Sequence, residues 1–269
     1  MSKLTIYNVS FPKLGINLKI NPIVFSFGAI TVRWYGVIIA LGFLLAFLYI
    51  LKRSKDFGFQ KEKIESITFI TSIVAIISAR LYYVIFYPGD FYIKNPYKIF
   101  NINEGGIAIY GAILGGILTL WIMSKRNNID FLSLLDLMSL GVLIGQTIGR
   151  WGNFVNQEAF GTVTNLPWGM SSENTLNQTV HPCFLYESLG CLLCFVFLHY
   201  YSLKSKYSKG NIFLMYLVIY GILRFLIEGL RTDSLIIPGT FIRVSQIVSI
   251  LLVIISILLI SRKMHNKKY

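Results

Sequence analysis

Long runs of apolar residues are the feature that most restricts how this chain can fold. Several of them approach or exceed the roughly 18–20 residues that a helix needs to cross a bilayer. Of the 269 residues, 55% are hydrophobic and 14% are charged, whereas a soluble domain carries about 25% charged residues. The sequence therefore predicts an integral membrane protein.

The positions of these runs predict an all-α, polytopic membrane protein with about seven transmembrane helices. Residues 1–31 contain Pro12 and Pro22. Within them, residues 1–21 lack the continuous apolar segment of a cleavable signal peptide. We expect residues 1–31 to form an extended or partly amphipathic lead-in, so that the first true span acts as the insertion signal. Without a repeat or a linker, residues 1–269 are expected to form a single integral membrane domain. The expected spans are residues 34–51, 67–87, 105–123, 131–151, 183–201, 211–230 and 244–260.

Basic residues predict the orientation of the chain in the membrane. Fourteen Lys and Arg residues lie in the segments after the first, third and fifth expected spans and in the C-terminal tail. Cytoplasmic loops are rich in basic residues, so we expect these segments in the cytoplasm and the N-terminus outside. The net charge of +13 is spread over short clusters between apolar runs. This distribution favours contact with anionic lipid headgroups and argues against nucleic-acid binding.

Ionisable residues within a membrane span are costly to bury, which makes them candidates for a functional site. Tyr220, Arg224, Glu228 and Arg231 follow one another at intervals of four, four and three residues. This spacing places them on one face of a helix. Arg224 and Glu228 can form an ion pair, and Arg231 then leaves this face with a surplus positive charge. The structural alternative is a self-neutralised pair that only fixes helix packing.

A second polar cluster lies at the end of the fourth expected span, where residues 149–158 read GRWGNFVNQE. Arg150, Asn153 and Gln157 share a face if the helix continues through them. An arginine that extends to the membrane surface is the alternative for Arg150. That alternative does not explain the polar side chains of Asn153 and Glu158.

Other spans contribute polar and small residues. Arg80 shares a helical face with Tyr83, a face suited either to binding phosphate or carbonyl groups or to helix packing. Gly111 and Gly115 form a G-x-x-x-G pattern, which is typical of closely packed helices. The remaining residues of interest are Arg33-Trp34-Tyr35, Glu104, Tyr110, His181 and Glu187, and three cysteines expected to be small buried side chains, Cys183, Cys191 and Cys194.

Four arginines, Arg80, Arg150, Arg224 and Arg231, together predict a positively lined cavity in the outer half of the membrane. A lipid phosphate or another anion would balance this charge. Arginine suits the task because its planar fork binds two phosphate oxygens at once. The three histidines are dispersed along the chain, so we expect no metal site and no cofactor.

The segment 149–158 resembles the characteristic motif G-R-x-G-N-F-x-N-x-E of the prolipoprotein diacylglyceryl transferase family. The resemblance extends in order over almost the whole chain. Further matching positions are Arg33-Trp34-Tyr35-Gly36, Ala79-Arg80-Leu81, Glu104-Gly105-Gly106, His181-Pro182, Leu185-Tyr186-Glu187, Tyr220-Gly221, Arg224-Phe225 and Glu228.

This resemblance implies an activity. The family transfers the diacylglyceryl group of phosphatidylglycerol to the thiol of the lipobox cysteine of a prolipoprotein. A thioether forms and glycerol phosphate leaves, which is the first step of bacterial lipoprotein maturation. The implied partners are phosphatidylglycerol, prolipoprotein signal peptides with a lipobox cysteine, and membrane lipids. The implied location is the bacterial cytoplasmic (inner) membrane, with seven spans and the N-terminus outside.

The resemblance also assigns roles to individual residues. Arg150 matches the arginine that binds the phosphatidylglycerol headgroup. Many members have a histidine where this chain has Tyr110, so a mechanism with that histidine as general base does not transfer. The expected substrate-binding residues are Arg150, Asn153, Gly161, Tyr35, Arg80, Tyr220, Arg231 and Glu187, and the expected catalytic residues are Arg150, Arg224, Glu228, Tyr110 and Glu158.

The reaction needs a stabilised leaving phosphate and a deprotonated thiol. Charge-assisted donors stabilise developing negative charge best in a water-poor site, and we assign Arg150 and Arg224 to this role. The thiolate is the nucleophile, because the neutral thiol reacts poorly. Glu228, Glu158 or Tyr110 would accept its proton, or nearby arginines would lower the thiol pKa without a dedicated base.

Other functions are also compatible with arginines in membrane spans. The first alternative is a transporter or flippase for an anionic lipid or organic phosphate. The absence of an inverted repeat and of paired broken helices argues against it. The second is another membrane transferase, such as a glycerol phosphate acyltransferase, but the sequence lacks an evident His/Asp or Ser-based acyl-transfer set. A purely structural scaffold leaves the buried charges unexplained.

Overall fold

The computed structural model describes residues 6–28, 30–101, 105–204, 208–237, 239–240 and 242–265. Glu104 lies outside this description, as do three of the fourteen basic residues counted above, Lys206, Lys267 and Lys268. The chain divides into two compact units, Met1–Leu48 with Ser139–Tyr269, and Tyr49–Met138. This division does not test the expected single membrane domain, which stays a prediction.

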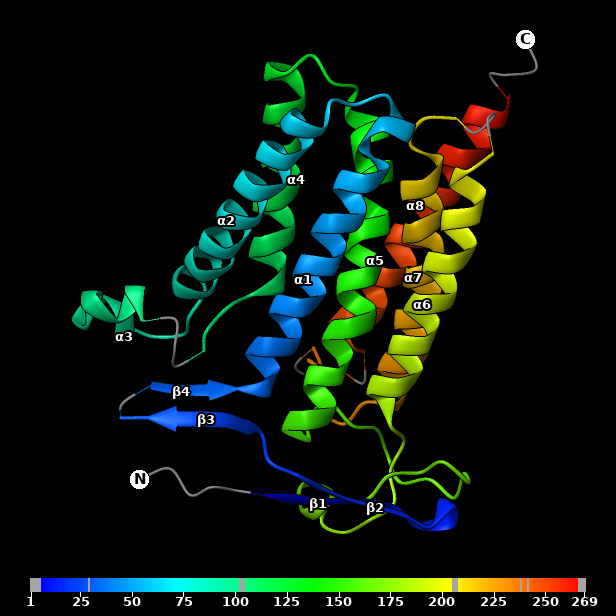
Figure 1. The fold of residues 1–269 in the computed structure, drawn as a ribbon. Helices are drawn as coiled ribbons and strands as arrows, with labels where there is room; N and C mark the ends of the chain where they lie inside the picture. Colours follow the sequence, from blue (N-terminus) through cyan, green and yellow to red (C-terminus); the bar gives the residue numbers. More distant parts are fainter. Residues whose placement is uncertain are drawn as a thin grey trace. The chain divides into compact units, whose positions relative to one another are not determined.

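The first unit consists mainly of long helices (Figure 1). It contains most of α1 (Trp34–Arg53), the second half of α5 (Phe131–Asn156), α6 (Cys183–Ser202), α7 (Asn211–Leu230) and α8 (Val244–His265). These helices agree closely with the expected spans, and α7 has the expected bounds. Their apolar faces enclose small buried side chains, including all three cysteines, as predicted.

The N-terminal residues form two β-hairpins, which the sequence analysis did not predict. Strand β1 (Tyr7–Phe11) pairs with β2 (Ile16–Ile20), and β3 (Ile23–Phe27) pairs with β4 (Ile30–Arg33). Gly15, with a φ of 67°, closes the turn of the first hairpin, a conformation that favours glycine. The lead-in is extended, which was one of the two expected forms, but its strands pair with one another. The expectation of an all-α fold is therefore wrong for this segment, although the described chain is mostly helical.

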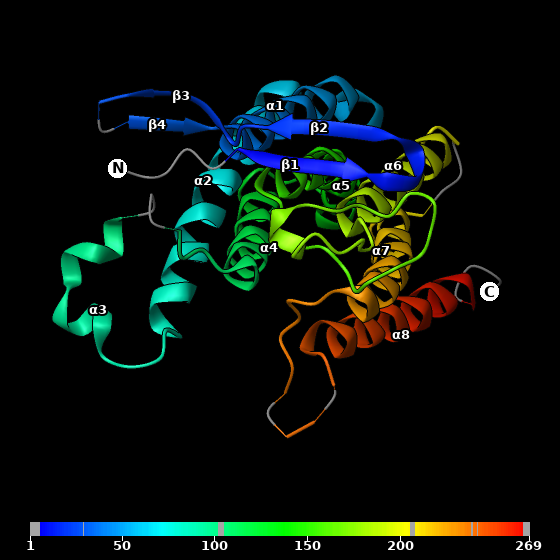
Figure 2. The same ribbon diagram turned by 90° about the horizontal axis from the view of Figure 1, so that it is seen from below.

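The first hairpin and the segment between α5 and α6 lie together at one end of the helices of this unit (Figures 1 and 2). Ser10 of β1 and Ser171 exchange backbone hydrogen bonds of 2.8 Å. Val9, Met170, Val180 and Phe184 form a small buried cluster beneath them. This packing fixes the segment that leads from the end of α5 to the start of α6.

The second unit contains α2 (Lys61–Ile85), the short helix α3 (Phe91–Lys94) and α4 (Ile109–Arg126). Helices α2 and α4 pack closely where the G-x-x-x-G pattern lies. A Cβ atom on Gly111 would lie 2.5 Å from Tyr82 Cβ, and one on Gly115 would collide with Ser78. The prediction that Gly111 and Gly115 permit close helix packing is confirmed.

Among the described residues, six helices are long and apolar enough to cross a membrane. The third expected span corresponds to α4, which has 18 residues, ends in Lys125 and Arg126, and is not one of the six. The six segments are Trp34–Phe57, Lys61–Ile85, Phe131–Asn156, Cys183–Ser202, Asn211–Leu230 and Val244–His265.

Candidate functional site

A buried carboxylate connects three helices of the first unit. Glu187 of α6 accepts hydrogen bonds from Arg150 of α5, from Arg224 Nη1 of α7 at 3.2 Å and from the Tyr220 hydroxyl at 3.1 Å. Only 2% of the Glu187 side chain is exposed, whereas Arg150 and Arg224 keep 23% and 19%. The carboxylate therefore holds the inner sides of two guanidinium groups and leaves part of each accessible.

Arg224 also pairs with Glu228, one helical turn further along α7. The distance between Arg224 Nη2 and Glu228 Oε2 is 2.6 Å, which confirms the predicted pair. Glu228 Oε2 is buried and accepts no hydrogen bond within the described part of the chain. Arg224 and Glu228 thus form an ion pair in which the N–H groups of Arg224 are not directed at Glu228 Oε2.

Further polar residues of the site lie at the C-terminal end of α5. Arg150 Nη1 donates to Asn153 Oδ1 at 3.1 Å, and Asn153 Nδ2 donates to Glu158 Oε1 at 2.9 Å. The helix ends at Asn156, and Gln157 has a φ of 51°. The three residues were expected to share a helical face if the helix continued through Gln157. The helix ends before Gln157, so this residue does not lie on the helical face of Arg150 and Asn153.

Arg231 follows the last residue of α7 and is paired with Asp233. Its Nε and Nη2 donate to the two carboxylate oxygens at 2.9 and 2.7 Å. These hydrogen bonds hold the pKa of Asp233 below its ordinary value. The prediction of a surplus positive charge on this face is wrong, because Asp233 neutralises Arg231.

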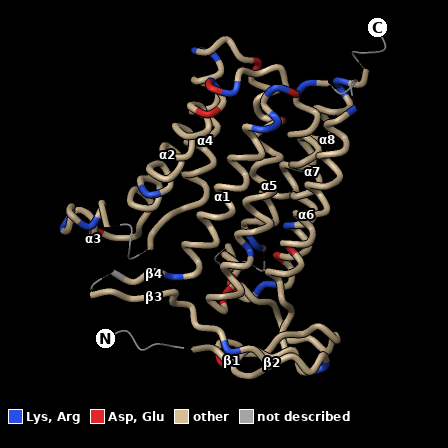
Figure 3. The backbone as a smooth tube through the Cα atoms, in the orientation of Figure 1, with Lys and Arg blue, Asp and Glu red and all other residues tan. Residues whose placement is uncertain are grey.

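The cluster as a whole contains more carboxylates than guanidinium groups. Its three guanidinium groups belong to Arg150, Arg224 and Arg231, and its four carboxylates to Glu187, Glu228, Glu158 and Asp233. Figure 3 shows acidic and basic residues together at the ends of α5, α6 and α7. The prediction of a positively lined cavity is therefore wrong for these helices. They form a network of paired charges.

Tyr35 lies against the end of α5. A Cβ atom on Gly152 would be only 2.7 Å from Tyr35 Cδ2, so the absence of a side chain at Gly152 lets the ring approach the helix. The motif glycine thus brings Tyr35 of α1 to the helical turn that carries Arg150 and Asn153. This contact agrees with the expected place of Tyr35 beside the site.

Gly161 lies where three segments of the chain meet. A Cβ atom there would be 2.7 Å from His181 Cβ, 2.9 Å from Cys183 Sγ and 3.1 Å from the Leu230 carbonyl oxygen. The Gly161 N–H donates to His181 O at 2.9 Å. Any larger residue would separate the start of α6 from the end of α7. Gly161 therefore shapes the site through packing.

His181 belongs to a small aromatic cluster at the start of α6. Its Nδ1 lies 3.2 Å from the Tyr186 hydroxyl, which accepts a hydrogen bond of 2.8 Å from Trp168 Nε1. Partial burial lowers the pKa of His181. The neutral imidazole is thereby favoured, and the ring links the loop before α6 to the helix itself.

Arg80 is part of the second unit and is 6% exposed. All five guanidinium N–H groups have a backbone carbonyl as acceptor, at 2.7–2.9 Å, on Lys98, Ile99, Asn101, Gly105 and Gly106. Arg80 thus holds the segment that precedes α4. These contacts favour the packing alternative over phosphate binding. Tyr110 lies on α4 of the same unit and is partly exposed.

The structure adds polar residues that the sequence analysis did not identify. Gln146 Nε2 donates to the Tyr216 hydroxyl at 3.2 Å, and the rings of Tyr216 and Tyr220 stack with centroids 5.7 Å apart. Tyr216 precedes Tyr220 by four residues, as Gln146 precedes Arg150. Extending both polar faces by one turn would have found them. They form a polar layer deeper in the helices, next to the Glu187 cluster.

Metal ligands are not assembled in this site. In the residues that the structure describes, no group of three or more His, Cys, Asp or Glu side chains is placed to hold a metal ion. Three carboxylates of the cluster, Glu187, Glu228 and Asp233, have arginine partners, and Glu158 accepts a hydrogen bond from Asn153. The chemistry available from the chain itself is charge-assisted binding of an anion and proton transfer by a carboxylate or a phenol.

Known proteins match this chain over most of its length. The family model described as prolipoprotein diacylglyceryl transferase matches residues 22–262. The phosphatidylglycerol–prolipoprotein diacylglyceryl transferase of Finegoldia magna is 44% identical over 88% of this chain and 93% of its own. Its namesake in Clostridioides difficile is 41% identical over 86% and 91%, and that in Staphylococcus aureus is 40% identical over 90% and 88%. The chain therefore belongs to the prolipoprotein diacylglyceryl transferase family.

Proposed function

We propose that this protein transfers the diacylglyceryl group of phosphatidylglycerol to the lipobox cysteine of prolipoproteins. Family membership supports the reaction class. The observation that carries the assignment to this site is the pair of guanidinium groups, Arg150 and Arg224, held side by side on one buried carboxylate. The substrates would be phosphatidylglycerol and the signal peptide of a precursor.

The phosphate of the lipid would bind to the accessible sides of Arg150 and Arg224. Each side chain is about one fifth exposed, while Glu187 and Glu228 contact the inner sides. In this arrangement the carboxylates orient the guanidinium groups and offset the cost of burying them. Glu187 is then a positioning residue, and Arg150 and Arg224 are the groups that contact the phosphate.

The reaction exchanges one bond of the glyceryl carbon for another. The cysteine thiolate attacks the glyceryl carbon that bears the phosphate oxygen, a C–S bond forms and the C–O bond breaks. Glycerol phosphate leaves with the electron pair of that bond, so negative charge builds up on its oxygens. Arginine donors directed at these oxygens stabilise the transition state more than the ground state.

Three groups are candidates for the acceptor of the thiol proton. Glu228 is buried and paired with Arg224, and Glu158 is exposed and hydrogen-bonded to Asn153. Tyr110 replaces the histidine that many family members have at this position. An exposed carboxylate is easier for an incoming peptide to reach, which supports testing Glu158 first.

In the membrane we propose seven spans, with α4 as the seventh in addition to the six long apolar helices. The N-terminus would be outside and the C-terminus in the cytoplasm of a bacterial inner membrane. The basic residues after α1, α4 and α6 and after α8 support this orientation. The cluster at Arg150 would then lie near the outer leaflet.

A transporter or flippase for an anionic lipid is the alternative function. The paired charges of the cluster do not favour it, because Arg150, Arg224 and Arg231 each have a carboxylate partner. The continuous helices α5, α6 and α7 also differ from the broken helices of many transporters.

Incubation of the purified protein with phosphatidylglycerol labelled in its acyl chains and a lipobox peptide tests the proposed reaction. We expect label on the peptide cysteine and none on a peptide in which serine replaces that cysteine. Movement of labelled lipid between leaflets without peptide modification would instead support a flippase.

A further inference from the structure

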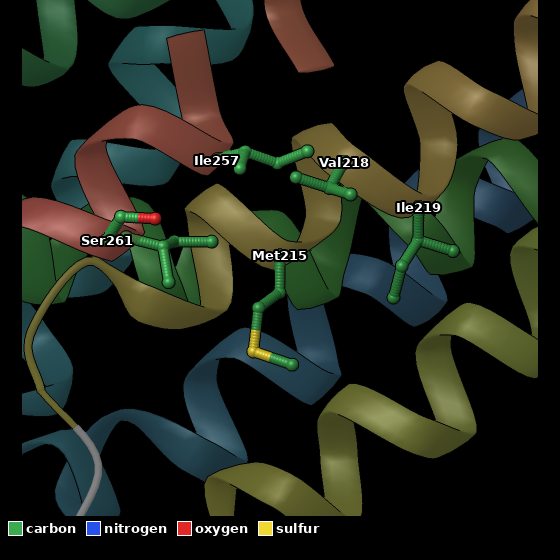
Figure 4. Close-up of a pocket in the computed structure, with 6 residues that line it drawn as sticks. Met215, Val218, Ile219, Ile257 and Ser261 are labelled. Carbon is green, nitrogen blue, oxygen red and sulfur yellow. The ribbon is translucent and has the colours of Figure 1, made fainter. Parts of the chain in front are cut away.

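At the end of the first unit where α7 begins and α8 ends, a groove separates the two helices. Part of it is a cavity of about 190 Å³ lined by Met215, Val218 and Ile219 of α7 and by Ile257, Ile260 and Ser261 of α8. Figure 4 shows these side chains coming from both helices. The walls are therefore almost wholly apolar.

A second cavity, of about 320 Å³, continues this groove towards the helix ends. It shares Met215 and Ile260 with the first. Its other lining residues are mostly polar or basic, namely Tyr201, Ser208, Asn211, Lys263 and Met264. From Ile219 to Asn211 the groove follows eight residues of α7, about 12 Å of helix. The groove thus has an apolar interior and a polar mouth.

The two helices are in close contact further along. A Cβ atom on Gly221 would lie 2.7 Å from Val253 Cγ2 and 3.3 Å from the Ser249 carbonyl oxygen. Gly221 thereby lets α7 and α8 touch at that level. Nearer the helix ends, Met215 and Ile260 line both cavities.

The mouth of the groove is basic. Lys263 Nζ donates to the Lys209 carbonyl oxygen at 2.7 Å, which holds this ammonium above the mouth. An ammonium has three N–H donors, and this hydrogen bond uses one of them. The mouth is also at the N-terminal end of α7, the positive end of the helix dipole.

The segments that form the groove contain no acidic residue of their own. The sequence has no Asp or Glu in residues 189–227 or 234–269, the stretches that contain the groove. Within the described residues, the buried Asn211 Oδ1 at the mouth also lacks a hydrogen-bond donor. An apolar channel that ends in positive charge and an unsatisfied acceptor matches an acyl chain attached to an anionic headgroup with its own N–H or O–H donor.

We propose that this groove binds an anionic glycerophospholipid of the adjacent leaflet, separately from the site at Arg150. One acyl chain lies between α7 and α8, along Met215, Ile219 and Ile257. The phosphate contacts Lys263, and a headgroup hydroxyl or ammonium donates to Asn211. The bound lipid fills the space between the helices and stabilises their contact.

Photo-crosslinking in mixed vesicles tests this proposal. The probe is phosphatidylserine with a diazirine on one acyl chain, compared with phosphatidylcholine that carries the same acyl chain. After irradiation of the full-length protein, mass spectrometry locates the labelled peptides. We expect several-fold more label from phosphatidylserine than from phosphatidylcholine on residues 215–219 and 257–261. Equal labelling by the two lipids would overturn the proposal.

Adjacent basic residues on α8 provide matched variants. Lys263→Gln removes a charge that lines the groove, whereas Arg262→Gln removes the same charge from a neighbouring residue that does not line it. We expect only Lys263→Gln to abolish the preference for phosphatidylserine. An equal loss in both variants would mean diffuse attraction to a basic surface and would contradict a defined site. The readout is the position of the label, so it is independent of transferase activity.

Discussion

Arg150 on α5 donates a hydrogen bond to Glu187 on α6, a carboxylate whose side chain is only 2% exposed. The two residues are 37 positions apart in sequence. Their contact fixes an arginine of the family motif to a neighbouring helix, and the same carboxylate also receives Arg224. The orientation of both arginines therefore depends on Glu187.

Replacing Glu187 by Gln should impair transfer strongly. The variant keeps the shape of the side chain but removes the charge that two buried guanidinium groups share. A hydrogen bond to a charged group contributes about 1.5–3 kcal/mol, so we expect transfer to fall at least about tenfold. Peptide lipidation, with thermal unfolding in detergent as a control for folding, measures this. A fully active and stable variant would show that Glu187 does not position the arginines.

Arg224→Lys separates charge from geometry. Lysine keeps the positive charge, but its single ammonium cannot contact Glu187 and Glu228 as the guanidinium fork does. We expect kcat to fall about tenfold or more, because the phosphate loses an oriented donor. Steady-state kinetics against phosphatidylglycerol measures this. Wild-type turnover would mean that Arg224 acts as a simple point charge.

The two stacked tyrosines of α7 offer a matched pair. Tyr220→Phe removes the hydroxyl that donates to Glu187 at 3.1 Å, whereas Tyr216→Phe removes one that accepts a hydrogen bond from Gln146, a neutral group. Since bonds to charged groups are worth more, we expect the larger loss of transfer in Tyr220→Phe, roughly tenfold. Equal effects of the two substitutions on the transfer rate would argue against a specific role of the Tyr220 hydroxyl.

Gly161→Ala should destabilise the protein. The new Cβ would meet the Leu230 carbonyl oxygen at 3.1 Å and His181 Cβ at 2.7 Å, and overpacking typically costs about 1–3 kcal/mol. We expect a lower melting temperature. Gly145→Ala on α5 is the control, because no neighbouring atom lies within 4 Å of a Cβ there. A melting temperature of Gly161→Ala equal to that of the control would contradict the packing role.

The contact between Glu173 and β1 should depend on pH. Hydrogen bonds from Asn8 lower the pKa of Glu173. A carboxylate with a lowered pKa stabilises the folded state above its unfolded pKa of about 4.3, and this contribution is lost as the pH falls through the folded pKa. We expect the Asn8 amide to exchange faster with deuterium at low pH, after correction for intrinsic exchange. Glu173→Gln should abolish this dependence, and an unchanged dependence would exclude Glu173 as its cause.

The long helices could be predicted because their signal is local. The expected span 211–230 coincides with α7, and the four-residue spacing of Arg224 and Glu228 was sufficient to predict their ion pair. The hairpin of residues 7–20 was missed because its packing depends on residues distant in sequence, as in the buried cluster of Val9, Met170 and Phe184. Strand propensity alone is too weak to reveal such pairs.

The composition of the site was easier to predict than its charge balance. The arginines of the cluster were identified from their position in the spans and from the family motif. Their partners depend on which helices are neighbours, which one sequence does not give. Glu187, one of the expected substrate-binding residues, joins Arg150 to Arg224, and Asp233 neutralises Arg231. The proposed function therefore depends on oriented guanidinium groups and not on an excess of positive charge.

The transfer assay on Arg150→Ala tests the central claim most directly. The variant protein, shown by its unfolding transition to be inserted and folded, is incubated with labelled phosphatidylglycerol and a lipobox peptide. If Arg150 binds the leaving phosphate, transfer to the cysteine falls to the background of a reaction without enzyme. Transfer at a rate near that of the wild-type protein would contradict the assignment.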